Sequence, residues 1–129
     1  MTLFRAMRPH EDGFPIVASK RWGLGVRIEG RSRDVTVRDG MVGAMGGGMS
    51  VARDWRDLID DYLPPEFGGT SKKEVLFAVE ETDLPGGLIV KGAGPRKGHY
   101  EVQPRRKMPI DVYVRLLEGT RNHWRRVKP

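Results

Sequence analysis

The sequence predicts an α+β fold with a small antiparallel β core. Several short apolar segments show the two-residue alternation of strands and are separated by turns rich in Gly and Pro. The C-terminal segment instead repeats its apolar residues at helical spacing. A chain of 129 residues, 38% of them hydrophobic, is long enough for one ordinary core, so we expect a single domain over residues 1–129.

The N-terminal half predicts three short strands and a glycine-rich loop. The first strand is expected at residues 3–6, where Arg5 interrupts an apolar segment. Two more are expected at residues 25–28 and 34–37, followed by a turn at Asp39-Gly40. Residues 43–48 include four glycines and precede Met49-Ser50-Val51. Because glycine has no side chain, we expect this loop to bring the backbone close to another surface.

The middle of the chain predicts one short helix and three strands. Asp54 is expected to cap a helix near residues 55–63, whose apolar residues recur at helical spacing before Pro64-Pro65 stops it. Residues 74–81, 88–91 and 99–103 alternate as strands do and are separated by Gly- and Pro-containing turns. We expect these three strands to form a meander.

The C-terminal segment predicts a long helix over residues 109–127. Pro109 suits a first-turn position. The helical apolar positions are Ile110, Tyr113, Val114, Leu117, Trp124 and Val127. Gly119 costs about 1 kcal/mol relative to Ala inside a helix and is expected to mark a bend. One face of this helix should pack on the sheet.

Composition limits the classes of function. The chain has no cysteine, and His10, His99 and His123 match no usual metal-ligand spacing, so we expect no metal. There is no run of about 18 apolar residues and no apolar signal-peptide core at the N-terminus. We therefore expect neither a membrane span nor Sec export, and a protein that acts in a cytosol. Residues 1–90 carry a net charge of −2 and residues 91–129 carry +8, which favours an anionic partner or cofactor.

Three segments, taken in order, resemble small type VI secreted toxins with an ADP-ribosyltransferase-like fold. They are Leu3-Phe4-Arg5-Ala6, then Asp39-Gly40 followed by Gly47-Gly48-Met49-Ser50-Val51, and then residues 83–127 with Leu88-Ile89-Val90-Lys91 and His99-Tyr100-Glu101. The resemblance implies a split β core and NAD as cofactor. It also implies growth arrest of a target cell, by ADP-ribosyl transfer to an intracellular target or by NAD hydrolysis.

The same resemblance implies the site residues and the partners. Arg5, Ser50 and Glu101 stand at the catalytic positions, and Arg5, Gly47, Gly48, Ser50 and His99 at the NAD-binding ones. Met49 stands where the family has threonine. The toxins do not always carry an acid at the position of Glu101, whereas ADP-ribosyltransferases in general do. The implied partners are an ADP-ribose acceptor and a neutralising immunity or antitoxin protein, expected to be acidic. The absence of an export signal fits either delivery by a contractile secretion machine or use within the producing cell.

The residue types suit this chemistry, but each has a plainer interpretation. Arg5 has a planar donor fork for phosphate or ribose oxygens, or is an edge-strand arginine. Glu101 stabilises positive charge as the nicotinamide bond breaks, or is an outward glutamate paired with Arg105 or Arg106. Ser50 bridges the other two site residues, or belongs to an ordinary glycine-rich turn. Three aromatic residues either stack on a ligand ring or belong to the core: Tyr62, Trp22 and Trp55. Three basic residues either contact phosphate or are simply solvated: Lys91, Arg96 and Lys97.

Two other functions remain open from the sequence. The first is a small basic ribonuclease toxin with His99 as general acid or base, Glu101 as base and Arg105 or Arg106 as phosphate clamp. The second is a non-enzymatic nucleic-acid binder that uses the basic C-terminal segment, although Trp124 is its only aromatic candidate for base stacking. Nucleic acid is therefore the less favoured partner.

Overall fold

A computed structural model describes residues 1–43 and 45–129. Ala44, in the predicted glycine-rich loop, lies outside the described residues. The strands are β1 (Thr2–Met7), β2 (Met41–Val42), β3 (Met49–Ala52), β4 (Val75–Glu80), β5 (Leu88–Gly92), β6 (His99–Pro104), β7 (Met108–Pro109) and β8 (Arg125–Arg126). The helices are α1 (Ile110–Glu118) and the 3-10 turns η1 (Trp55–Asp57), η2 (Pro65–Phe67), η3 (Glu81–Asp83) and η4 (Arg121–His123).

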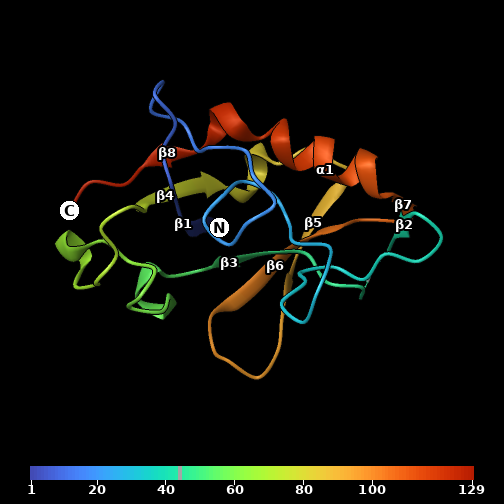
Figure 1. The fold of residues 1–129 in the computed structure, drawn as a ribbon, viewed down its shortest axis with the longest axis horizontal. Coiled ribbons are helices and arrows are strands. Elements are labelled where there is room, and N and C mark those ends of the chain that lie inside the picture. Colours follow the sequence, from blue (N-terminus) through green and yellow to red (C-terminus); the bar gives the residue numbers. More distant parts are fainter. Residues whose placement is uncertain (44) are drawn as a thin grey trace.

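The protein is an α+β fold with an antiparallel β core, as the sequence predicted, and this core is one six-stranded sheet. Its strand order is β5-β6-β3-β1-β4-β8, and β2 pairs with β7 in a separate two-stranded sheet (Figure 1). Strand β1 pairs with β4 over six residues, from Thr2 opposite Glu80 to Met7 opposite Val75. In contrast, β1 pairs with β3 only at Phe4 and Ala52. The sheet therefore opens between β1 and β3 beyond this pair.

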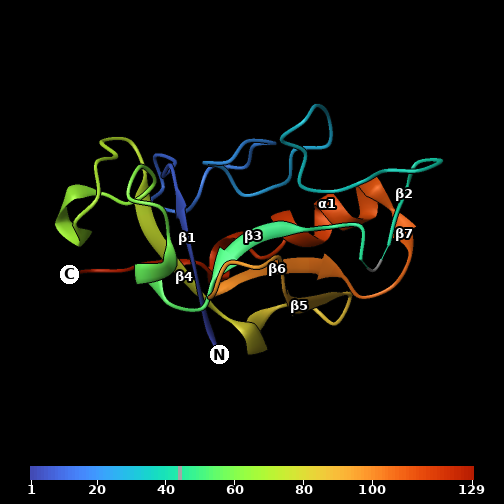
Figure 2. The ribbon, with the colours of Figure 1, turned by 90° about the horizontal axis from the view of Figure 1, so that it is seen from below.

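The connection from β1 to β3 is mostly irregular and lies along one side of the sheet (blue to cyan in Figure 2). The strands predicted at residues 25–28 and 34–37 are wrong, since only an isolated bridge from Val35 to Gly47 occurs there. The two segments contact each other through Arg27 and Asp34, whose backbone and side chains bond to one another instead of to a ladder. The predicted turn at Asp39-Gly40 is confirmed, and both residues have a positive φ.

The predicted strands at 74–81, 88–91 and 99–103 are confirmed as β4, β5 and β6, but the meander is wrong. Strands β1 and β8 occupy both edges of β4, which leaves no edge for β5. After η3 the chain instead crosses to the far edge of the sheet, where β5 pairs with β6 alone.

Both helix predictions need correction. Asp54 does accept a bond from the Arg56 N–H, but the chain is already extended at Leu58, so only the short turn η1 forms in place of a helix over 55–63. Trp55 packs edge-on against Phe67, whereas Leu58, Ile59 and Tyr62 line one cavity from an irregular segment. A helical face was therefore the wrong explanation for their spacing.

The C-terminal helix ends at Glu118 and does not continue to residue 127. Thr120 Oγ1 donates to the Leu117 carbonyl and accepts from the Trp124 indole, which lets the chain turn while both polar groups stay bonded. The chain then returns to the sheet as β8, beside β4. Trp124 is buried because the chain folds back here, not because the helix goes on.

Helix α1 begins directly after β7, near β2, runs from there along one side of the sheet (Figure 1) and buries Tyr113 and Leu117. The Tyr113 hydroxyl donates to the Val102 carbonyl on β6 and accepts from the Met49 N–H on β3. Burial raises the pKa of this phenol, so it stays a neutral donor. The helix is thereby fixed to the two strands that carry Ser50 and His99. Among the described residues, no helix is long and apolar enough to cross a membrane.

Candidate functional site

Arg5 lies on the central strand β1 and is 6% exposed. Its guanidinium donates to the Gly23 carbonyl from Nε and Nη2, at 3.2 and 2.9 Å, and to the Ser50 carbonyl from Nη1 at 2.7 Å. A longer bond of 3.5 Å reaches the Lys20 carbonyl. Arg5 thus holds β1 to β3 where the backbone pairing has stopped, and it is not an edge-strand residue.

The positive charge of Arg5 is buried without a directly bonded carboxylate among the described residues. Burial lowers the pKa of this guanidinium to about 10, with Asp34 opposing the change and the charges of Arg27 and Arg21 adding to it. Arg5 is still protonated at neutral pH. Because its partners are carbonyls and not carboxylates, its positive charge is not neutralised by direct pairing.

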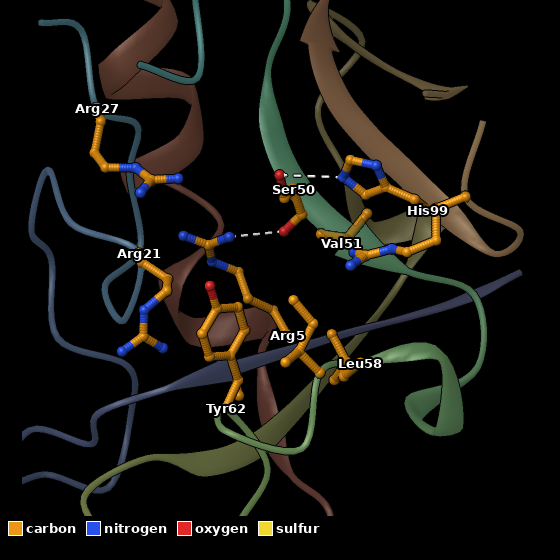
Figure 3. A pocket seen from close by; sticks show the side chains of 11 residues that line it. Arg5, Arg21, Arg27, Ser50, Val51, Leu58, Tyr62 and His99 are labelled. Carbon is orange, nitrogen blue, oxygen red and sulfur yellow. Dashed lines mark hydrogen bonds between the residues drawn. The ribbon is translucent and has the colours of Figure 1, made fainter. Parts of the chain in front are cut away.

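Ser50 and His99 form a second polar pair beside Arg5. The Ser50 hydroxyl on β3 lies 3.3 Å from Nε2 of His99 at the start of β6 (Figure 3). Both side chains are half-buried. The strand order β6-β3-β1 brings His99, Ser50 and Arg5 together although they come from three distant parts of the chain.

These three residues line one cavity of about 360 Å³ at the opening between β1 and β3. The complete lining is Arg5, Ala6, Arg21, Arg27, Ser50, Val51, Leu58, Ile59, Tyr62, Arg96 and His99 (Figure 3). Four of these residues are arginines and none is Asp or Glu. A concave site with apolar walls and a few convergent polar groups is typical of a small-molecule site, and the sign of the charge selects an anion.

Two of the arginines come from the irregular β1–β3 connection. Arg21 lies with its guanidinium 4.0 Å from the centre of the Tyr62 ring and 3.2 Å from Oε1 of Glu74. Glu74 is 5% exposed and is held from its other oxygen by the Ser71 hydroxyl. The Nη1 of Arg21 is buried and has no hydrogen-bond partner in the described part of the chain.

Arg27 is anchored by a carboxylate in the same way. Its Nη2 and Nε donate to the two oxygens of Asp34, at 2.9 and 3.2 Å, and Asp34 also accepts from the Arg27 backbone N–H. The hydrogen bond with Asp34 raises the pKa of Arg27. Figure 3 shows the Arg27 guanidinium extended toward Arg5 and Ser50.

Glu101 lies beside the cavity without lining it. In the β3–β6 register it stands directly opposite Ser50, so the two side chains project from the same side of the sheet with Cβ atoms about 5 Å apart. Its carboxylate accepts a 2.9 Å bond from the Gln103 amide, and Lys91 stands opposite it on β5. In the described part of the chain neither Arg105 nor Arg106 pairs with Glu101, and Arg105 donates instead to the carbonyls of Gly86 and Leu88.

Gly47 and Gly48 approach the protein's own backbone closely. A Cβ on Gly48 would meet the Val102 carbonyl oxygen at 2.4 Å, and one on Gly47 would meet the Asp34 oxygen at 2.1 Å. Neither glycine is among the residues that line the cavity. The predicted close-contact loop is therefore confirmed, and the surface it approaches is formed by Asp34 and strand β6.

The remaining candidates separate into two groups. Tyr62 and Arg96 line the cavity, whereas Trp22, Trp55, Lys91 and Lys97 do not. Trp22 instead packs under the Arg8 guanidinium at 4.1 Å. Sequence reasoning missed Arg21 and Arg27. The one available signal was that Arg27 interrupts the apolar stretch of residues 24–28, as Arg5 interrupts residues 3–6.

The basic C-terminal segment is partly neutralised in the fold. Four of its arginines form ion pairs with carboxylates: Arg115 with Asp111, Arg121 with Asp12, Arg125 with Glu80 and Arg126 with Glu66. Three of these acids come from the N-terminal part of the chain. These ion pairs therefore connect the basic C-terminal segment to the more acidic residues 1–90.

Comparison of the chain with protein-family models, with curated proteins and with solved structures gives no match in any of the three.

Proposed function

We propose that the protein is an ADP-ribosyltransferase-like enzyme that takes NAD as its substrate and acts as a growth-arresting toxin. The observation that carries this proposal is the alignment of Arg5, Ser50 and Glu101 on three neighbouring strands, β1, β3 and β6, where Arg5 and Ser50 line one cationic cavity and Glu101 stands opposite Ser50 beside it. These are the strands on which the toxin resemblance expects the site.

The cavity suits part of a dinucleotide. Its volume of about 360 Å³ lies within the range of small-molecule sites. Arginines on its wall suit a pyrophosphate, because a guanidinium presents paired donors to phosphate oxygens. Tyr62 adds an aromatic ring, and Ser50 and His99 add hydrogen-bonding groups for ribose or amide oxygens.

The reaction breaks the glycosidic bond to nicotinamide, with positive charge developing on the sugar. An anion held next to the sugar stabilises that charge. Glu101 is the carboxylate available for this role, since it stands opposite Ser50 and the Gln103 amide fixes its orientation. Arg5 contributes by keeping β1 and β3 in place at the mouth of the site.

The proposed function is tested by incubating the purified protein with NAD and measuring nicotinamide release. Glu101→Gln keeps the size of the side chain and is expected to lower the rate about a hundredfold. Glu11→Gln, which changes an exposed glutamate of the β1–β3 connection, serves as the matched control. Because a strict transferase needs its acceptor, the assay is repeated with a cell extract. Cleavage of added RNA with NAD left intact in both assays would overturn the proposal in favour of a ribonuclease.

The toxin role is tested in cells. Expression in a bacterial cytosol is expected to arrest growth, and Ser50→Ala is expected to relieve the arrest while the protein still accumulates. We propose an acidic immunity protein as the neutralising partner, since cationic side chains surround the cavity. Undiminished toxicity of the folded Ser50→Ala variant would show that the arrest comes from elsewhere in the molecule.

A further inference from the structure

The arginines of the cavity fall into two kinds according to where their donors point. Nε and Nη2 of Arg5 bond to carbonyls of the β1–β3 connection, and Nη1 bonds to Ser50 of β3. Most of its donors are used within the protein. Arg21 and Arg27 each bond to one carboxylate, and the Nη1 of Arg21 is buried with no partner in the described structure. Arg96 is exposed and also lines the cavity.

The charge of this region is +2. Four arginines line the cavity, and the carboxylates bonded to them are Glu74 and Asp34. A pyrophosphate diester, the group that joins two nucleosides in a dinucleotide, carries two negative charges at neutral pH. The two arginines without a carboxylate partner in the described structure are Arg5, which is buried, and Arg96, which is exposed. An unpaired buried charge is costly, so the charge of Arg5, together with that of Arg96, favours a ligand of the opposite charge.

The positions of the arginines favour two phosphate groups over one. Arg21 and Arg27 reach the cavity from the β1–β3 connection, whereas Arg96 reaches it from the β5–β6 connection, three residues before His99. Figure 3 shows His99 on the side of Ser50 opposite Arg21 and Arg27. The two anchored arginines are rigid, since Asp34 and the buried Glu74 fix their orientation before any ligand arrives.

We propose that Arg21, Arg27 and Arg96 form a pyrophosphate-binding subsite, with Glu74 and Asp34 as positioning residues, and that Arg5 has a structural role in the wall of the cavity. The inference rests on the proposed function for the identity of the dinucleotide. Arg5 was expected to hold phosphate or ribose oxygens; in this proposal the phosphates are held instead by Arg21 and Arg27 of the β1–β3 connection and by Arg96 of the β5–β6 connection.

The subsite is tested by titrating the full chain with ADP-ribose in a calorimeter. We expect Arg21→Gln, Arg27→Gln and Arg96→Gln each to weaken the affinity about tenfold or more, as for the loss of a charge-assisted hydrogen bond. Adenosine, which lacks the pyrophosphate, is expected to bind weakly and equally to all of these variants. Arg115→Gln is the matched control, because it removes an arginine that is also paired with an aspartate but lies on α1.

Two results would overturn the inference. One is unchanged ADP-ribose affinity in Arg96→Gln, a variant of an exposed residue that leaves the fold intact, together with unchanged affinity in folded Arg21→Gln. The other is tighter binding of a short RNA than of ADP-ribose with the same dependence on the arginines. The test is separate from that of the proposed function: arginine-dependent ADP-ribose binding without NAD turnover supports the subsite alone. NAD turnover with arginine-independent ADP-ribose binding contradicts the subsite alone.

Discussion

The Arg5 guanidinium donates a 2.7 Å hydrogen bond to the Ser50 carbonyl at the place where β1 and β3 stop pairing. One side chain therefore substitutes for backbone pairing in the centre of the sheet. The opening that it spans is the cavity, so the residue that holds the strands together also sets the separation between them.

The structural role of Arg5 predicts a loss of stability in Arg5→Ala. The substitution leaves the carbonyls of Gly23 and Ser50 without a donor, and we expect the free energy of unfolding to fall by about 3 kcal/mol or more. Urea unfolding followed by circular dichroism measures the change. Arg115→Ala, at an exposed arginine of α1, should change it by less than about 0.5 kcal/mol. Equal unfolding midpoints for the two variants would contradict this role.

The glycine-rich loop approaches β6 closely at Gly48, which predicts that a methyl group added there destabilises the fold. In Gly48→Ala the new Cβ would lie 2.4 Å from the Val102 carbonyl oxygen, so we expect a destabilisation of about 1–3 kcal/mol. Gly86→Ala is the control, since nothing lies within 4 Å of its Cβ position. Thermal unfolding compares the two variants with the parent protein. A Gly48→Ala variant as stable as Gly86→Ala would show that the backbones do not approach so closely.

The ion pair between Asp12 and Arg121 predicts a shift in one carboxyl titration. The side-chain hydrogen bond with Arg121 lowers the pKa of Asp12, and the backbone bond from Phe14 acts in the same direction. The pair therefore stabilises the folded state at pH values above the ordinary pKa of an aspartate. This stabilisation is lost as the pH falls through the lowered pKa of Asp12. The NMR shift of the Asp12 side-chain carboxyl carbon, followed against pH, should have its midpoint at a lower pH than that of a free aspartate in the parent protein. In Arg121→Gln the midpoint should move closer to that of a free aspartate. A titration of Asp12 unaffected by that substitution would refute the pairing.

The Ser50–His99 contact predicts coupled effects on NAD turnover. Ser50→Ala and His99→Gln are each expected to lower nicotinamide release about tenfold or more, because each breaks the 3.3 Å pair in the cavity. The double variant should be less impaired than the product of the two single effects. Independent, multiplicative effects would mean that the two residues act separately. Unchanged unfolding temperatures are the control for loss of fold.

The sequence predicted the strands better than their arrangement. Period-two alternation located β1, β4, β5 and β6, because it depends on local side-chain direction. It could not show that β1 and β8 would occupy both edges of β4, since strand order depends on contacts between distant segments. Helical spacing likewise predicted the burial of Trp124 but not the turn at Thr120 that produces it.

The toxin resemblance predicted Arg5, Ser50 and His99 as site residues, and all three line the cavity. A local pattern marked Arg5 as well, because it interrupts an apolar segment. No such pattern marked Arg21, because its burial results from Glu74 and Tyr62, which lie about forty or more residues further along the chain. Residues so far apart in the sequence form no local pattern, so only the folded structure shows which carboxylate orients Arg21.

The three histidines allow the most direct test of the central claim, that NAD binds in the cavity between β1 and β3. Of His10, His99 and His123, His99 lines the cavity and the other two are exposed elsewhere. NMR of the imidazole groups during a titration with NAD, with signals assigned through His99→Gln, therefore locates the ligand within one experiment. If NAD binds there, saturable shifts of the His99 signals alone are expected. Unshifted His99 signals at saturating NAD, or shifts confined to His10 or His123, would contradict this claim.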